Sequence, residues 1–124
     1  RQPSAEERKL VEQFITAHER LDTEAVIAIA ARDIRVTMPP LPYCFQGTEA
    51  IRPLMADAAA MGEWRLVPAG ANQMPAAASY LRRPGDSVFR AFKLDVMRVE
   101  GAVIAEITTF PADHFAAFGL QPTL

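Results

Sequence analysis

The stretch from Val88 to Phe110, VFRAFKLDVMRVEGAVIAEITTF, decides the fold. Apolar and polar residues alternate in it on both sides of Glu100-Gly101, a period of two that is typical of strands with one buried face. A glycine-containing pair between two alternating runs favours a tight hairpin turn. The sequence therefore predicts two antiparallel strands, over residues 88–99 and 102–110.

Two further strands precede this hairpin. The same alternation holds over residues 64–71 and 74–82, which are separated by Asn72-Gln73. The run Pro84-Gly85-Asp86 then provides the turn that leads into the hairpin. Consecutive strands with short connections usually pair with one another, so we expect these segments to form an antiparallel meander.

Helical periodicity dominates the first half of the chain. Ser4 and Glu7 match a capping box, and apolar residues recur behind it at helical spacing over roughly 16 residues. A second, short helix is expected over residues 22–31, and Gly47-Thr48 opens a third. A short terminal helix is expected over residues 111–119.

A strand of its own lies between the second and third of these helices. Ile34, Val36 and Met38 alternate with polar residues, which predicts a strand over residues 34–38. The run Pro39-Pro40-Leu41-Pro42 ends this strand, because proline cannot donate a hydrogen bond to a β-ladder.

These elements together indicate an α+β domain. Three amino-terminal helices followed by a meander favour a curved antiparallel sheet wrapped by the helices, a cone with an apolar interior. Such an interior is a common place for a small-molecule pocket. No linker or repeat divides residues 1–124, so one domain is predicted. The chain begins with Arg1 rather than methionine, and we expect it to be a piece of a longer chain.

Composition excludes several classes of protein. The net charge of −2 is made of charges of both signs along the chain, which is unlike the basic stripe of a DNA-binding domain. No apolar run approaches the ~20 residues that span a bilayer, and the first apolar pattern is amphipathic rather than that of a signal peptide. The single cysteine, Cys44, fits a reducing compartment. We therefore expect a soluble, cytoplasmic protein without direct nucleic-acid or membrane contact.

The hairpin places a candidate pair of carboxylates. If Glu100-Gly101 is the whole turn, Asp95 lies directly opposite Glu106. Thr108 then lies on the same face of the sheet. Two readings stay open: Lys93 neutralises the pair, or the two carboxylates share a proton in a functional pocket. Both depend on the register, because a slip of one residue moves Glu106 to the other face.

Four amphipathic side chains are further candidates for the lining of a cavity. Tyr43, Trp64 and Tyr80 each join an aromatic ring to a polar group, and Asn72 offers a carboxamide. Such groups can orient a ligand by a hydrogen bond while they pack against its apolar part. Each has an equally common structural role at a strand end.

The remaining reactive residue types indicate neither catalysis nor metal binding. Cys44 has no base near it in the sequence and is expected to be a small buried hydrophobe. His18 lies beside the apolar stripe of the first helix and is expected in the core or at its rim. His114 follows Asp113, and a local hydrogen bond explains it. The two histidines and the cysteine are far apart and lack metal-ligand spacing, so no metal is predicted. No cofactor and no catalytic residue are predicted either.

A set of short runs extends over nearly the whole chain. They are Phe14–Asp22, DIRVTMPPLP at 33–42, Gly47 with Ile51, WRLVP at 64–68 with Ala71-Asn72-Gln73, and IAEITTF at 104–110. This combination resembles SnoaL-like domains, which share the nuclear transport factor 2-like fold. The pairing of TMPPLP with WRLVP resembles the C-terminal accessory domain of one group of bacterial extracytoplasmic-function RNA polymerase sigma factors.

The same fold supports ketosteroid isomerase and polyketide cyclases. Against the isomerase pattern, Asp95 matches the oxyanion-hole aspartate, which must be protonated to donate a hydrogen bond. Phe14 stands at the position of the partner tyrosine and Met38 at that of the general-base aspartate. Because neither side chain can transfer a proton at neutral pH, isomerase chemistry by that route is expected to be absent. Phe14 and Met38 are expected to line the pocket with Asp95.

The sigma-factor resemblance implies a regulatory role without catalysis. The partners would be upstream sigma-factor domains and RNA polymerase, and the pocket would take a small apolar or weakly polar ligand. A homodimer through the open face of the sheet is a further expectation from the fold. Two alternatives remain: a cyclase- or isomerase-type enzyme that depends on Asp95 or Glu106, and a dimerisation module with a filled interior and an exposed apolar patch.

Overall fold

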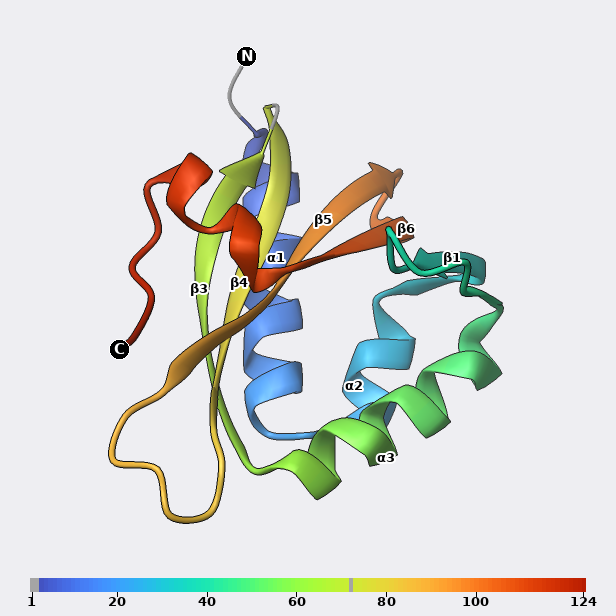
Figure 1. The fold of residues 1–124 in the computed structure, drawn as a ribbon. Helices are drawn as coiled ribbons and strands as arrows, with labels where there is room; N and C mark the ends of the chain where they lie inside the picture. The colour runs from blue at the N-terminus through green and yellow to red at the C-terminus, as the bar shows by residue number, and fades with distance from the viewer. Residues whose placement is uncertain (1–2, 72) are drawn as a thin grey trace.

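The computed structural model describes residues 3–71 and 73–124, which form one curved sheet with helices packed against one face (Figure 1). The helices are α1 (Ala5–Glu19), α2 (Thr23–Ala28) and α3 (Ile51–Met61). The strands are β1 (Ala30–Thr37), β2 (Cys44–Gln46), β3 (Glu63–Ala71), β4 (Met74–Arg82), β5 (Arg90–Glu100) and β6 (Val103–Pro111). Within the described residues the strand order is β2-β1-β6-β5-β4-β3. The expected α+β class and the β3–β6 meander are confirmed.

Helix α1 begins where the sequence predicts. The Glu7 amide donates to Ser4 Oγ at 3.1 Å and the Ser4 amide donates to Glu7 Oε1 at 2.8 Å, so the capping box is confirmed. The apolar side of α1 packs on β3 and β4 (Figure 1). The buried residues of this side are Leu10, Val11, Phe14, Ala17 and His18.

Strand β1 corrects two expectations. It begins at Ala30, within the range expected to be helical, because tertiary hydrogen bonds end α2 early: the Ile104 amide of β6 donates to Ile29 O at 2.8 Å. It also pairs with β6 in parallel, so the expectation of a wholly antiparallel sheet was wrong. The unpredicted strand β2 pairs with β1 over three residues, too few to show a period.

The register of the β5–β6 hairpin also differs from the expectation. Glu100 pairs with Val103, so the turn consists of residues 101 and 102, with Gly101 at φ 61°. A β-bulge between Arg98 and Val99 then leaves one residue of β6 extra. Asp95 consequently lies opposite Thr109 rather than opposite Glu106, and Glu106 lies opposite Arg98 on the other face of the sheet.

The end of the chain covers part of the sheet face that is turned away from α1 (Figure 1). The expected terminal helix is replaced by two 3₁₀ turns, η2 (Ala112–His114) and η3 (Ala116–Phe118). The buried Phe115 packs edge-on against Tyr80, whose hydroxyl donates to Gln121 O at 2.7 Å. Leu124 and Phe89 exchange backbone hydrogen bonds of 2.8 and 3.2 Å. Part of the face expected to mediate homodimerisation therefore packs against the chain's own tail.

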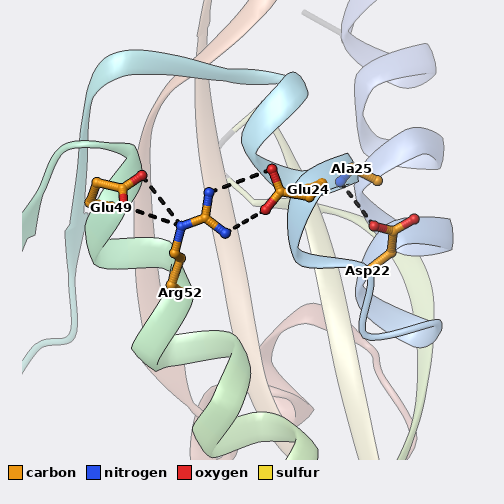
Figure 2. A network of polar contacts seen from close by, with 5 residues as sticks. All are labelled: Asp22, Glu24, Ala25, Glu49 and Arg52. Atoms are coloured by element: carbon orange, nitrogen blue, oxygen red, sulfur yellow. Dashed lines mark hydrogen bonds and ion pairs between the residues drawn. The ribbon is translucent and has the colours of Figure 1, made fainter.

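Polar contacts tie α2 to α3 on the outside of the molecule (Figure 2). Asp22 caps α2 by accepting from the Ala25 amide at 3.1 Å. The Arg52 guanidinium lies between Glu24 of α2 and Glu49 of the turn η1 (Thr48–Ala50), with Nε 3.2 Å from Glu49 Oε1. Exposed ion pairs contribute little to the free energy of unfolding. Here they connect α2, η1 and α3 across the surface.

Candidate ligand-binding pocket

A cavity of about 570 Å³ lies between the helices and the sheet. Residues of α1, α2 and α3 form one side, and residues of β1, β2, β3, β5 and β6 form the other. The segment from Met38 to Tyr43 contributes to the lining, and its Leu41 and Tyr43 side chains are each 54% exposed. The volume falls within the range of pockets that hold drug-sized ligands. The filled interior expected of a pure dimerisation module is therefore contradicted.

A buried ion pair forms the polar centre of this cavity. Lys93 Nζ lies 2.5 Å from Asp95 Oδ2, and the two side chains are 18% and 3% exposed. The Thr109 hydroxyl donates to Asp95 Oδ1 at 2.6 Å. Both carboxylate oxygens thus accept hydrogen bonds. Of the two readings of the carboxylates, the structure supports neutralisation of Asp95 by Lys93, while Glu106 lies outside the pair.

An irregularity in the sheet brings Lys93 to the cavity. The pairing of β4 with β5 shifts between Ser79 and Tyr80, so Phe92 is an extra residue in β5. Phe92 and Lys93 consequently both line the cavity, although neighbours in a regular strand point to opposite faces. No feature of the sequence marks this bulge, and so Phe92 was not predicted to line the cavity. The partner role of Thr109 was missed because of the separate bulge between β5 and β6.

Trp64 of β3 forms the wall beside the ion pair. Its indole N–H donates to Ala58 O of α3 at 2.9 Å, which holds the ring between helix and sheet. The Phe92 ring meets it edge-on at 5.3 Å between centroids, and Lys93 Nζ lies 5.7 Å from the Trp64 ring centroid. The ammonium is therefore stabilised by both a carboxylate and an aromatic face.

His18 lies in the same wall as an uncharged side chain. Its ring packs against Phe14 and Trp64 at centroid distances of 5.7 and 5.0 Å. Burial lowers the pKa of His18 to about 3, helped by the Lys93 ammonium and opposed by Asp95. Among the described residues, His18 Nδ1 has no hydrogen-bond partner. The expectation of a core or rim histidine is confirmed.

The buried His18 makes stability depend on pH. Because its pKa falls from 6.5 to about 3 on folding, its contribution is complete above pH 6.5 and is lost as the pH falls towards 3. From about pH 7 to about pH 5 we expect the free energy of unfolding to fall by about 2 kcal/mol on this account. Urea unfolding should show this loss, and His18→Gln should remove most of it. An equal loss in the variant would contradict the assignment.

The structure brings together five of the eight expected ligand-binding residues. Phe14, Met38, Tyr43, Trp64 and Asp95 all line the cavity. Asn72 lies outside the described residues.

Three expectations about side chains at or near the cavity were wrong. Thr108 pairs with Val96 and points to the face away from the cavity, and its neighbour Thr109 lines the cavity in its place. Glu106 does not line the cavity: its Oε1 is 3.5 Å from Arg98 Nε. Cys44 is exposed rather than buried, because β2 is an edge strand, and its Sγ accepts from Arg35 at 3.5 Å. Tyr80, the fourth amphipathic candidate, holds the tail instead.

The site lacks the acid and base of the isomerase pattern. Phe14 and Met38 line the cavity beside Asp95. Neither the phenylalanine nor the methionine side chain can transfer a proton. Asp95 accepts from Lys93 and Thr109, which is the opposite of the donor role in an oxyanion hole. The arrangement is suited to binding and orienting a molecule rather than to that proton transfer.

Residues 3–71 and 73–124 contain neither a cluster placed to hold a metal ion nor a helix that could cross a membrane. No group of three or more histidine, cysteine, aspartate or glutamate residues in this part of the chain is placed to hold a metal ion. None of its helices has the length and hydropathy to cross a membrane.

Comparison with known proteins finds similarity in sequence to a sigma factor and similarity in structure to many proteins. No protein-family model matches the chain. It is 31% identical over 125 residues to the ECF RNA polymerase sigma factor SigG of Mycobacterium tuberculosis, an alignment that covers 98% of the chain. The chain spans 33% of the length of that relative.

The structural neighbours have low sequence identity and show the fold alone. A protein with a ketosteroid isomerase-like fold from Catenulispora acidiphila, in complex with trimethylamine, superposes with a TM-score of 0.66 at 17% identity, covering 91% of this chain and 94% of its own. An NTF-2 like protein from Burkholderia xenovorans superposes with a TM-score of 0.69 at 12% identity, covering 86% of this chain and 83% of its own. An LEH-like epoxide hydrolase of M. tuberculosis superposes with a TM-score of 0.68 at 15% identity, covering 90% of this chain and 86% of its own.

Proposed function

We propose that this chain, which has the nuclear transport factor 2-like fold, is a regulatory C-terminal domain of an extracytoplasmic-function sigma factor. The observation that supports this most is the similarity of almost the whole chain to one third of SigG. A match that includes 98% of a chain is what a shared domain gives. The net charge of −2 and the mixture of charges leave DNA contact to other parts of such a protein.

The cavity supplies a means of regulation. Upstream sigma-factor domains and RNA polymerase would be the partners, in the cytoplasm, and the domain would act by packing against them. A small, mostly apolar ligand in the cavity shifts that packing if it binds one arrangement more tightly than the other. Couplings of this kind change an affinity by roughly 5–150-fold.

Promoter-specific transcription in vitro tests the regulatory role. The native gene product would be compared with the same product ending before Ala5, each with core RNA polymerase. We expect removal of the domain to change transcription at least about fivefold, in line with typical coupling between sites. Equal transcription by both forms, at equal occupancy of polymerase, would contradict the proposal.

A small-molecule enzyme is the second candidate, and the buried Asp95 in the cavity is the observation that favours it. Structural neighbours include an M. tuberculosis LEH-like epoxide hydrolase and a polyketide cyclase-like protein from Xanthomonas campestris. If the chain turns over a substrate, Asp95→Asn should abolish the activity. Glu106→Gln should leave it intact, because Glu106 does not line the cavity. Equal loss in both variants would point to a chemistry away from this cavity.

A further inference from the structure

We propose that the Lys93–Asp95 ion pair makes the cavity selective for uncharged ligands, namely apolar molecules that carry one oxygen acceptor such as a hydroxyl or carbonyl group. The inference rests on the proposed function, in which the cavity is a ligand site. Lys93 would be the residue that determines this selectivity.

The charge of the cavity wall is balanced at its polar centre. Lys93 Nζ and Asp95 Oδ2 are 2.5 Å apart, and His18 beside them is uncharged. Asp57, the remaining charged residue of the lining, is exposed on α3. A ligand carboxylate would lose its hydration beside a lysine that Asp95 already neutralises. Such a ligand would bring one uncompensated negative charge into an apolar cavity.

A cationic ligand is disfavoured for a different reason. The aromatic face of Trp64 is where an ammonium ion would bind most favourably. Lys93 Nζ already lies 5.7 Å from the centroid of that ring. A second cation there would be repelled by the ammonium of Lys93.

The unused hydrogen-bonding capacity at this centre is that of a donor. The ammonium has three N–H groups, and Asp95 is its hydrogen-bond partner among the described residues. The Asp95 oxygens already accept from Lys93 and Thr109. A neutral oxygen on the ligand can accept from Lys93 without disturbing the ion pair, while the ligand's apolar part contacts Phe14, Trp64 and Phe92.

Ligands that share one alkyl chain and differ in the head group test this selectivity. Decan-1-ol, decanoate and decyltrimethylammonium would be titrated at neutral pH against Nile red bound to the 124-residue chain. We expect decan-1-ol to displace the dye with an affinity at least about tenfold higher than that of either ion, the size of one hydrogen bond to a charged group.

Asp95→Asn is the decisive variant because it keeps the shape of the site and removes the neutralising charge. Lys93 then lacks an anionic partner, so the affinity for decanoate should rise about a hundredfold, the upper size of a hydrogen bond between charged groups, and exceed that for decan-1-ol. Glu106→Gln is the matched control, since it removes a carboxylate of the same sheet that does not line the cavity. It should leave the order of the three affinities unchanged.

A second variant covers the case in which Asp95→Asn does not fold, as judged by circular dichroism. Lys93→Met combined with Asp95→Leu removes both charges, and decan-1-ol should bind about tenfold more weakly because its donor is lost. The proposal is overturned if decanoate equals decan-1-ol in the unmodified chain, if Asp95→Asn leaves the order unchanged, or if none of the three displaces the dye. The dye-displacement results do not depend on transcription. Failure of the sigma-factor role and failure of the ligand selectivity are therefore distinguishable.

Discussion

Replacing Gly62 by alanine is expected to lower the free energy of unfolding by about 4 kcal/mol, as the sum of backbone strain and overpacking. Gly62 joins α3 to β3 with φ 147° and ψ −149°, a region that is almost restricted to glycine. A Cβ at this position would lie 2.4 Å from Arg82 O, a backbone atom of the neighbouring strand. Because α3 and β3 both form walls of the cavity, the variant should lose ligand binding as well.

Gly70→Ala is the matched control for this prediction. Gly70 lies in β3, the strand that follows Gly62, and no atom lies within 4 Å of the Cβ that the substitution would add. Its free energy of unfolding should change by less than about 0.5 kcal/mol. Urea unfolding of the three proteins measures both values, and a loss below about 1 kcal/mol for Gly62→Ala would contradict the geometry at this junction.

Lys93→Met is expected to cost about 3 kcal/mol, because it leaves the Asp95 carboxylate buried with Thr109 as its remaining partner. Lys93 itself is 18% exposed, which places the value at the lower end for broken buried pairs. Chemical denaturation monitored by Trp64 fluorescence measures it directly, since Trp64 lies beside the ion pair.

Two companion variants separate charge from packing. Arg98→Met breaks the exposed pairs with Glu100 and Glu106 and should leave the free energy of unfolding nearly unchanged, because solvent screens exposed ion pairs. Adding Asp95→Leu to Lys93→Met should recover most of the loss, because no buried charge then remains. A double variant as unstable as the single one would mean that the lost packing of the lysine stem, not the charge, is responsible.

The parts of the fold that follow from local physics could be predicted from the sequence. One buried face imposes the alternation that locates β3, β4, β5 and β6, and the Ser4–Glu7 pair marks the start of α1 through its own hydrogen bonds. The parallel pairing of β1 with β6 could not be predicted in this way. It joins segments about seventy residues apart, and nothing in the periodicity of either segment selects the other as a partner.

The candidate site shows the same division. Asp95 and Trp64 reach the cavity because alternation fixes the face on which each side chain lies. Glu106 does not reach it, since the bulge beside Arg98 inserts one residue and reverses the faces of β6 beyond that point. The bulge that brings Phe92 to the cavity could not be predicted either, because an extra residue in a strand does not change the composition of the strand.

Intact mass and peptide mapping of the native gene product from its source cell test the central claim most directly. The sigma-factor proposal predicts a product about three times as long as this chain, as in the SigG relative of which the chain spans 33%, with peptides from additional domains. A native product of 13.6 kDa, the mass of this chain alone, would contradict the proposal and favour a stand-alone enzyme.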